Sequence, residues 1–178
     1  MFENPQQLIE QAKTAYQDED YPRAAEFFKT AQDGYAAAGD HASAAEMANN
    51  RSVALLKAGD AKGALQSVEG TDEIFVRAGD IKKQAMALAN KAAALEGLKK
   101  ISEAFQLYEQ SSDLLKQIGE NDLRAYVLKS ISAIQLRQGK QFEAVASMQA
   151  SLDNKPNPGI QDRFVKRLIQ WVYKLLGR

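Results

Sequence analysis

Few residues in this sequence could carry catalysis or hold a metal ion. His41 is the only histidine among the 178 residues, and there is no cysteine. A serine triad needs a histidine beside a nucleophile and an orienting acid, and zinc sites use several His or Cys ligands. Because nothing near His41 supplies those groups, we interpret it as part of a turn or as a surface residue. The sequence predicts a protein that is not an enzyme and has no metal or cofactor.

Two short segments resemble functional motifs, but neither supports the function. Gly59-Asp60-Ala61-Lys62-Gly63 lacks the spacing of a Walker phosphate loop. Asn50-Arg51-Ser52 matches the glycosylation motif, but it lies in the middle of an expected helix. Acidic residues such as Asp113 and Glu143 fall on amphipathic segments, which indicates solvated surface.

Composition favours one folded domain with no general affinity for polyanions. Hydrophobic residues make up 45% and charged residues 26%, which is ordinary globular usage. The 23 basic and 23 acidic residues cancel, so binding to nucleic acid or to an anionic membrane would need a local patch. The polar N-terminal segment and the lack of a long apolar run predict a cytoplasmic protein with no transmembrane segment. The length predicts a single domain over residues 1–178.

A helix-ending motif recurs every 20 residues. Ala-Gly-Asp stands at 38–40, 58–60 and 78–80, related tripeptides stand at 118–120 and 138–140, and Leu98-Lys99-Lys100 takes the remaining place. Glycine can close a helix in the left-handed conformation, and the following Asp can cap the next helix. Apolar residues recur three and four apart between these motifs, which predicts amphipathic helices and no strand. We expect nine helices, at about residues 5–17, 21–38, 41–58, 61–78, 81–97, 101–118, 121–138, 141–153 and 158–176.

Pairing these helices gives a repeat of 40 residues. Units that start at residues 5, 45, 85 and 125 align without a gap. Their eighth and twentieth places carry small residues, namely Ala12, Ser52, Ala92 and Ser132, and then Ala24, Ala64, Ala104 and Ala144. Their twenty-fourth places carry larger apolar residues, namely Phe28, Val68, Tyr108 and Met148. The pattern resembles the tetratricopeptide repeat (TPR), in a form longer than the usual 34 residues.

The resemblance implies an all-α, right-handed α-solenoid of four helix-turn-helix TPR-like repeats plus a C-terminal capping helix. The repeats would span about residues 5–44, 45–84, 85–124 and 125–157, and the capping helix residues 158–176. No single hairpin buries its apolar face alone, so each repeat is expected to pack on its neighbours and leave a concave side lined by the first helices.

The resemblance also implies a peptide groove on those first helices. We therefore expect a non-enzymatic scaffold that binds a peptide or helix of a protein partner. Asn50 and Asn90 occupy the same place in successive repeats, and an amide offers a donor and an acceptor to an extended backbone. The alternative is that these amides only bond neighbouring backbone. The expected groove residues are Lys13, Asn49, Asn50, Val53, Leu56, Lys57, Met86, Asn90, Tyr126, Lys129, Ser130 and Arg137.

Two residues argue against a carboxylate clamp in this groove. Functions other than peptide binding also stay open. The carboxylate clamp of the family has Lys and Asn where this chain has Ile9 and Lys13, so a clamp is disfavoured. A mixed basic and apolar groove would suit an acidic, hydrophobic peptide. A self-assembly module is the alternative function. A helical-repeat RNA reader is less favoured, because the chain is neutral overall.

The last predicted helix is more apolar than a cap requires. Ile160, Phe164, Leu168, Trp171 and Leu175 fall within about 80° of a helical wheel and would cover the fourth repeat. Other apolar residues widen the arc to about 180°. We expect a homodimer there, with a second chain's groove, a membrane surface or a deeply buried cap as alternatives. The residues expected at this oligomer interface are Val165, Ile169, Trp171, Val172 and Leu176.

Overall fold

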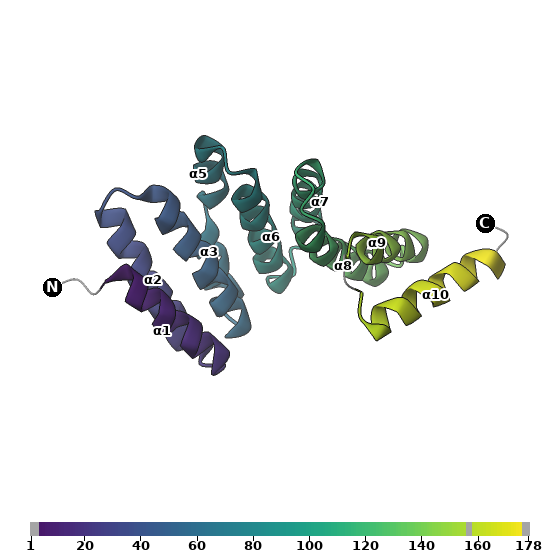
Figure 1. Ribbon diagram of the computed structural model, residues 1–178, viewed down its shortest axis with the longest axis horizontal. Helices are drawn as coiled ribbons and strands as arrows, with labels where there is room; N and C mark the ends of the chain where they lie inside the picture. The colour runs from purple at the N-terminus through teal and green to yellow at the C-terminus, as the bar shows by residue number, and fades with distance from the viewer. Residues whose placement is uncertain (1–3, 156–157, 176–178) are drawn as a thin grey trace. The chain divides into compact units, whose positions relative to one another are not determined.

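The computed structural model describes residues 4–155 and 158–175, with the side chains of residues 172–175 outside the description. Every regular element in these residues is a helix, as predicted (Figure 1). The helices are α1 (Pro5–Gln17), α2 (Tyr21–Ala37), α3 (His41–Lys57), α4 (Ala61–Val68), α5 (Thr71–Ala78), α6 (Ile81–Gly97), α7 (Ile101–Gln117), α8 (Asn121–Arg137), α9 (Gln141–Asn154) and α10 (Ile160–Leu175). They form two compact units, Met1–Leu107 and Tyr108–Arg178, and α7 crosses the boundary between them. The expected single domain stays a prediction.

The 20-residue motif ends helices as the sequence indicates. The glycines at 39, 59, 79, 119 and 139 all have left-handed φ values between 70° and 84°. Glu19 and Lys99 occupy the same place in their turns and adopt the same conformation, with φ of 62° and 63°. The Asp that follows the turn caps the next helix in four cases, where its carboxylate accepts the N–H three residues on. In Asp40, this bond from the Ser43 N–H is the main cause of a lowered carboxyl pKa.

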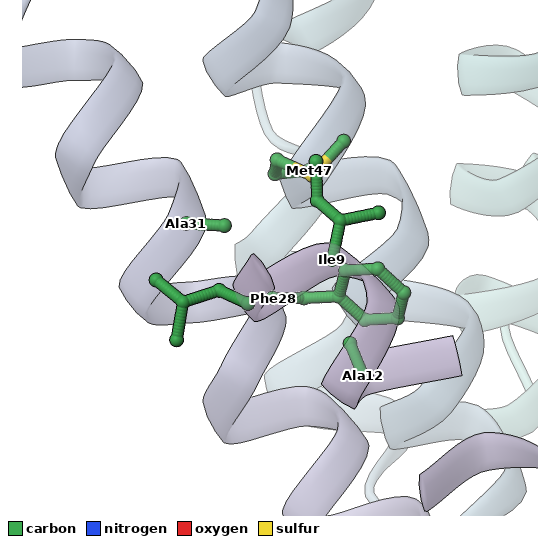
Figure 2. Packing of buried hydrophobic residues seen from close by; sticks show 6 residues of the cluster. Ile9, Ala12, Phe28, Ala31 and Met47 are labelled. Atoms are coloured by element: carbon green, nitrogen blue, oxygen red, sulfur yellow. The ribbon is translucent and has the colours of Figure 1, made fainter. Parts of the chain in front are cut away.

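The core of the first unit lies between successive helices. Helix α1 packs on α2, α2 on α3, and α3 on α4, α5 and α6. The small residues of the repeat are buried where the helices meet, since Ala12, Ala24, Ser52 and Ala64 have no exposed surface. Figure 2 shows Ile9, Ala12, Phe28, Ala31 and Met47, which form one cluster across the first three helices. The small residues at the eighth and twentieth places of the repeat therefore lie where neighbouring helices pack on one another.

The predicted helix over residues 61–78 is wrong in one respect, because it is broken into α4 and α5. Glu69 is extended with ψ of 125°, and Gly70 is left-handed with φ of 74°. The Thr71 hydroxyl then donates to the Val68 carbonyl across the break, at 2.9 Å. The break lets α5 pack against α3 and α6, where the Phe75 ring is buried against Ala45 and Ala87.

Replacing Gly70 with alanine tests this break, because the break and a continuous helix predict opposite changes in the free energy of unfolding. A left-handed alanine is strained, so the variant should lose about 1 kcal/mol of unfolding free energy in urea denaturation. If residues 61–78 formed one helix, alanine would instead stabilise it by about 0.5–1 kcal/mol.

The opposite substitution at another turn, Lys99→Gly, relieves a left-handed lysine. It should raise the free energy of unfolding by about 1 kcal/mol.

In the second unit, α8 packs on α9, and α9 contacts α10. Buried hydroxyls join α8 and α9: Ser132 Oγ donates to the Ala144 carbonyl and Ser151 Oγ to the Ala125 carbonyl, each at 2.6 Å. The repeat positions at Ser132 and Ala144 are therefore close-packed here as in the first unit.

The face of α10 that packs against the rest of the second unit is not the expected one. Ile169 is 8% exposed, whereas Ile160, Phe164, Leu168 and Trp171 of the predicted capping stripe are 87%, 66%, 48% and 59% exposed. Polar contacts select the inward face, since Asp162 bonds Lys155 and Lys166 pairs with Asp153. The apolar arc alone could not choose between its two halves. The expectation that the stripe covers the fourth repeat is therefore wrong for these four residues.

Candidate functional site

First-helix residues of α1, α3 and α6 line two pockets in the first unit. One has a volume of about 310 Å³ and is lined by residues of α1, α2 and α3. The other has a volume of about 340 Å³ and is lined mainly by residues of α3 and α6. Asn50 and Val53 of α3 line both, so the two pockets adjoin along α3. We call them the paired pockets.

The first of the paired pockets has an apolar wall and a polar rim. Phe28 of α2 is buried and Tyr16 is half-buried. The Tyr16 ring is held edge-on by Tyr21, with 5.2 Å between ring centroids. Lys13 lies at the rim, exposed, and its ammonium pairs with Glu10 at 2.7 Å. Gln17 completes the lining. Such a pocket suits an apolar side chain with polar groups at its entrance.

The second of the paired pockets contains three asparagines with different bonding. Asn49 is buried, and its amide nitrogen donates to the Ala45 carbonyl at 3.0 Å. Asn90 donates to the Asn49 side-chain oxygen at 3.2 Å. Within the part of the chain that the structure describes, the half-buried Asn50 amide has no hydrogen-bond partner. Asn50 is therefore the amide best placed to bond a ligand, while Asn90 is partly engaged by the neighbouring helix.

The second pocket contains ion pairs between acidic and basic side chains. The Lys83 ammonium lies 2.9 Å from a carboxylate oxygen of Glu46 and 3.8 Å from one of Asp80. The hydrogen bond to Glu46 is the main reason that the pKa of Lys83 is raised. Asp80 also caps α6 by accepting the Lys83 N–H. Lys82 completes the charged lining. The pocket is thus close to neutral, less basic than the sequence suggests.

The other predicted groove residues lie elsewhere. Tyr126 and Lys129 line a pocket of about 410 Å³ in the second unit, with residues of α9 and α10. Four more residues line neither this pocket nor the paired pockets: Leu56, Lys57, Ser130 and Arg137. The structure brings together Lys13, Asn49, Asn50, Val53, Met86 and Asn90.

The predicted oligomer interface is only partly described. Ile169 is buried within the chain, Val165 lines the pocket of the second unit, and Trp171 is exposed. The side chains of Val172 and Leu176 lie outside the described residues. The homodimer through this helix stays a prediction.

The sequence prediction missed several residues that line the paired pockets, on second helices and at the start of α6. Phe28 and Phe75 form part of the lining although neither belongs to a first helix. Phe28 occupies an apolar position of the repeat, which did not mark it as a site residue. Asp80 and Lys83 carried a usable signal, because an Asp at a helix start can cap the residue three places on.

The described residues contain no group of three or more histidine or acidic side chains arranged to hold a metal ion. Within the same residues, no helix combines the length and apolar character needed to cross a membrane.

Comparison with known proteins supports the fold. No protein-family model matches the chain, and no curated protein matches it. Among solved structures it is similar to a crystal structure from Podospora anserina, of a proposed kinesin light chain with nearly identical TPR-like repeats. The two are 16% identical, the TM-score is 0.75, and the match covers 98% of this chain and 89% of that one. This likeness shows an all-helical, TPR-like repeat fold, as the sequence resemblance implied. The 40-residue repeat type stays a prediction.

Proposed function

We propose that this chain is a non-enzymatic interaction protein that binds a peptide segment of a protein partner in the paired pockets. One observation carries the proposal: residues at corresponding first-helix places of three repeats line two adjoining pockets that share Asn50 and Val53. Repeat proteins with a TPR-like fold offer such extended surfaces to protein partners.

The lining favours a peptide of low net charge with apolar side chains. Lys13 and Lys83 already have carboxylate partners, so an acidic ligand would have to compete with Glu10 and Glu46. Packed helices lie about 8–10 Å apart, and an extended chain advances about 3.3 Å per residue. Apolar side chains two to four residues apart would therefore reach both pockets. The Asn50 amide between them would bond the peptide backbone.

Selection from a random peptide library against residues 1–178 tests this proposal. Asn50→Ala should weaken a selected peptide about 5- to 10-fold, because it removes one or two ligand hydrogen bonds. Stability should hardly change, since the Asn50 amide has no partner among the described residues. The control is Asn121→Ala, at an exposed asparagine of α8 in the second unit, which should leave affinity unchanged. Equal affinities in wild type and Asn50→Ala would count against this site.

A further inference from the structure

The exposed side of α10 combines an apolar stripe with unneutralised basic residues. The stripe consists of Ile160, Phe164, Leu168 and Trp171, all on the side opposite the buried Ile169. On a helical wheel, Arg163 and Arg167 border it along one edge. Both arginines are exposed. Arg163 Nε donates to the Pro158 carbonyl at 3.1 Å, and within the described residues no carboxylate pairs with either guanidinium.

Two acidic residues at α10 form ion pairs away from the stripe. Asp162 is the only acid in α10, and it bonds Lys155 and the Gly159 N–H. Asp153 of α9 pairs with Lys166. These contacts hold the helix by its inward face and leave the stripe and the two arginines outward. The outward face is therefore apolar along its centre and positive along one edge.

A second copy of α10 fits this face poorly. Antiparallel pairing about a twofold axis would bring the two Arg167 side chains to the same edge, where like charges repel. With about 200 Å² for a large side chain, the exposed fractions of the four apolar residues give roughly 500 Å² per chain. A stable interface buries about 800 Å² per partner. Area and charge both disfavour self-association through the stripe.

We propose that α10 binds the surface of a bilayer containing anionic phospholipids, with the stripe among the acyl chains and Arg163 and Arg167 at the headgroups. A helix with Trp, Phe and Leu on one side and Arg on the edge has the character of helices that lie in the membrane interface. The arginines give preference for anionic headgroups, which the neutral chain as a whole would not. The stripe runs from residue 160 to 171, about 16 Å along the helix axis, so it can lie flat.

Trp171 reports directly on this binding, because it is the only tryptophan of the chain. Full-length protein is mixed with vesicles of phosphatidylcholine alone or of phosphatidylcholine with phosphatidylserine. Cosedimentation and tryptophan emission are then measured. We expect binding and a blue shift with the anionic vesicles only, both weakened by added salt.

Variants at exposed positions separate the contribution of the arginines from that of the apolar stripe. Arg163→Gln with Arg167→Gln should weaken binding about 10- to 30-fold, because each basic residue contributes separately at an anionic surface. Phe164→Ser with Leu168→Ser should abolish it. Phe142→Ser is the matched control, since Phe142 is 68% exposed but lies on α9. Circular dichroism checks that each variant remains folded.

Four results would overturn the proposal. The first is no binding to the phosphatidylserine vesicles, and the second is equal binding to both kinds. The third is unchanged binding by the folded Phe164→Ser, Leu168→Ser variant. The last is a blue shift that rises with protein concentration in the absence of vesicles, together with a doubled mass, which would assign the stripe to a second copy of the chain.

Discussion

Phe75→Ala is expected to reduce the free energy of unfolding of the first unit by about 3–5 kcal/mol. The ring is 1% exposed and packs against Ala45 and Ala87, with Ile74 beside them. Alanines cannot move to fill the space that the ring leaves, so a cavity would add to the lost burial. Chemical denaturation, followed by far-ultraviolet circular dichroism, measures the change.

The neighbouring residue provides a control for this prediction. Val76 is 55% exposed on the same helix, so Val76→Ala should alter stability by no more than about 0.5 kcal/mol. If Phe75→Ala cost less than about 1 kcal/mol, α5 would not be docked through this ring. The explanation given for the break at Gly70 would then be wrong.

Val53→Arg is expected to lower peptide affinity about a hundredfold or more, which corresponds to at least about 2.7 kcal/mol. Val53 is half-buried and lines both paired pockets, so one substitution places a long, charged side chain in both. The guanidinium would fill apolar space and would lose hydration when a peptide covers it. Titration calorimetry with a selected peptide measures the loss.

Val76→Arg is the matched control for this prediction. It makes the same change at an exposed valine outside both pockets, so affinity should stay within about twofold of wild type. A folded Val53→Arg variant that still binds at wild-type affinity would exclude the paired pockets as the peptide site.

Helix positions could be predicted from the sequence because the turn chemistry is local. A glycine closes one helix and an aspartate caps the next, so the 20-residue motif marks most boundaries directly. At Lys99 the periodicity carried the prediction, because lysine does not favour the left-handed conformation on its own. The break at Gly70 could not be predicted, since a glycine inside an apolar pattern is also tolerated in a continuous helix.

The site was predictable only for the side chains that belong to first helices. Places transferred from the repeat pattern include Asn50, Val53 and Met86, which line the paired pockets. Phe75 lines the second of the paired pockets only because α5 changes direction after the break. That direction depends on tertiary packing and has no local signal in the sequence. The bond between Asn90 and Asn49 likewise joins two helices 41 residues apart and has no local signal.

The orientation of α10 shows a similar limit. Nearly half of its surface is apolar, so the sequence pattern allows either half of the arc to face inward. The pairing of Lys166 with Asp153 and of Asp162 with Lys155 decides between them. Those partners lie outside the helix, and a helical wheel does not include them.

Peptide binding in the paired pockets is tested most directly by nuclear magnetic resonance. The isotope-labelled chain is titrated with a peptide selected from the library, and backbone amide shifts are followed residue by residue. We predict the largest shifts in α1, α3 and α6, centred on Asn50 and Val53 and extending to Met86. Shifts confined to α8, α9 and α10, or to residues of the first unit outside the paired pockets, would contradict the proposed function.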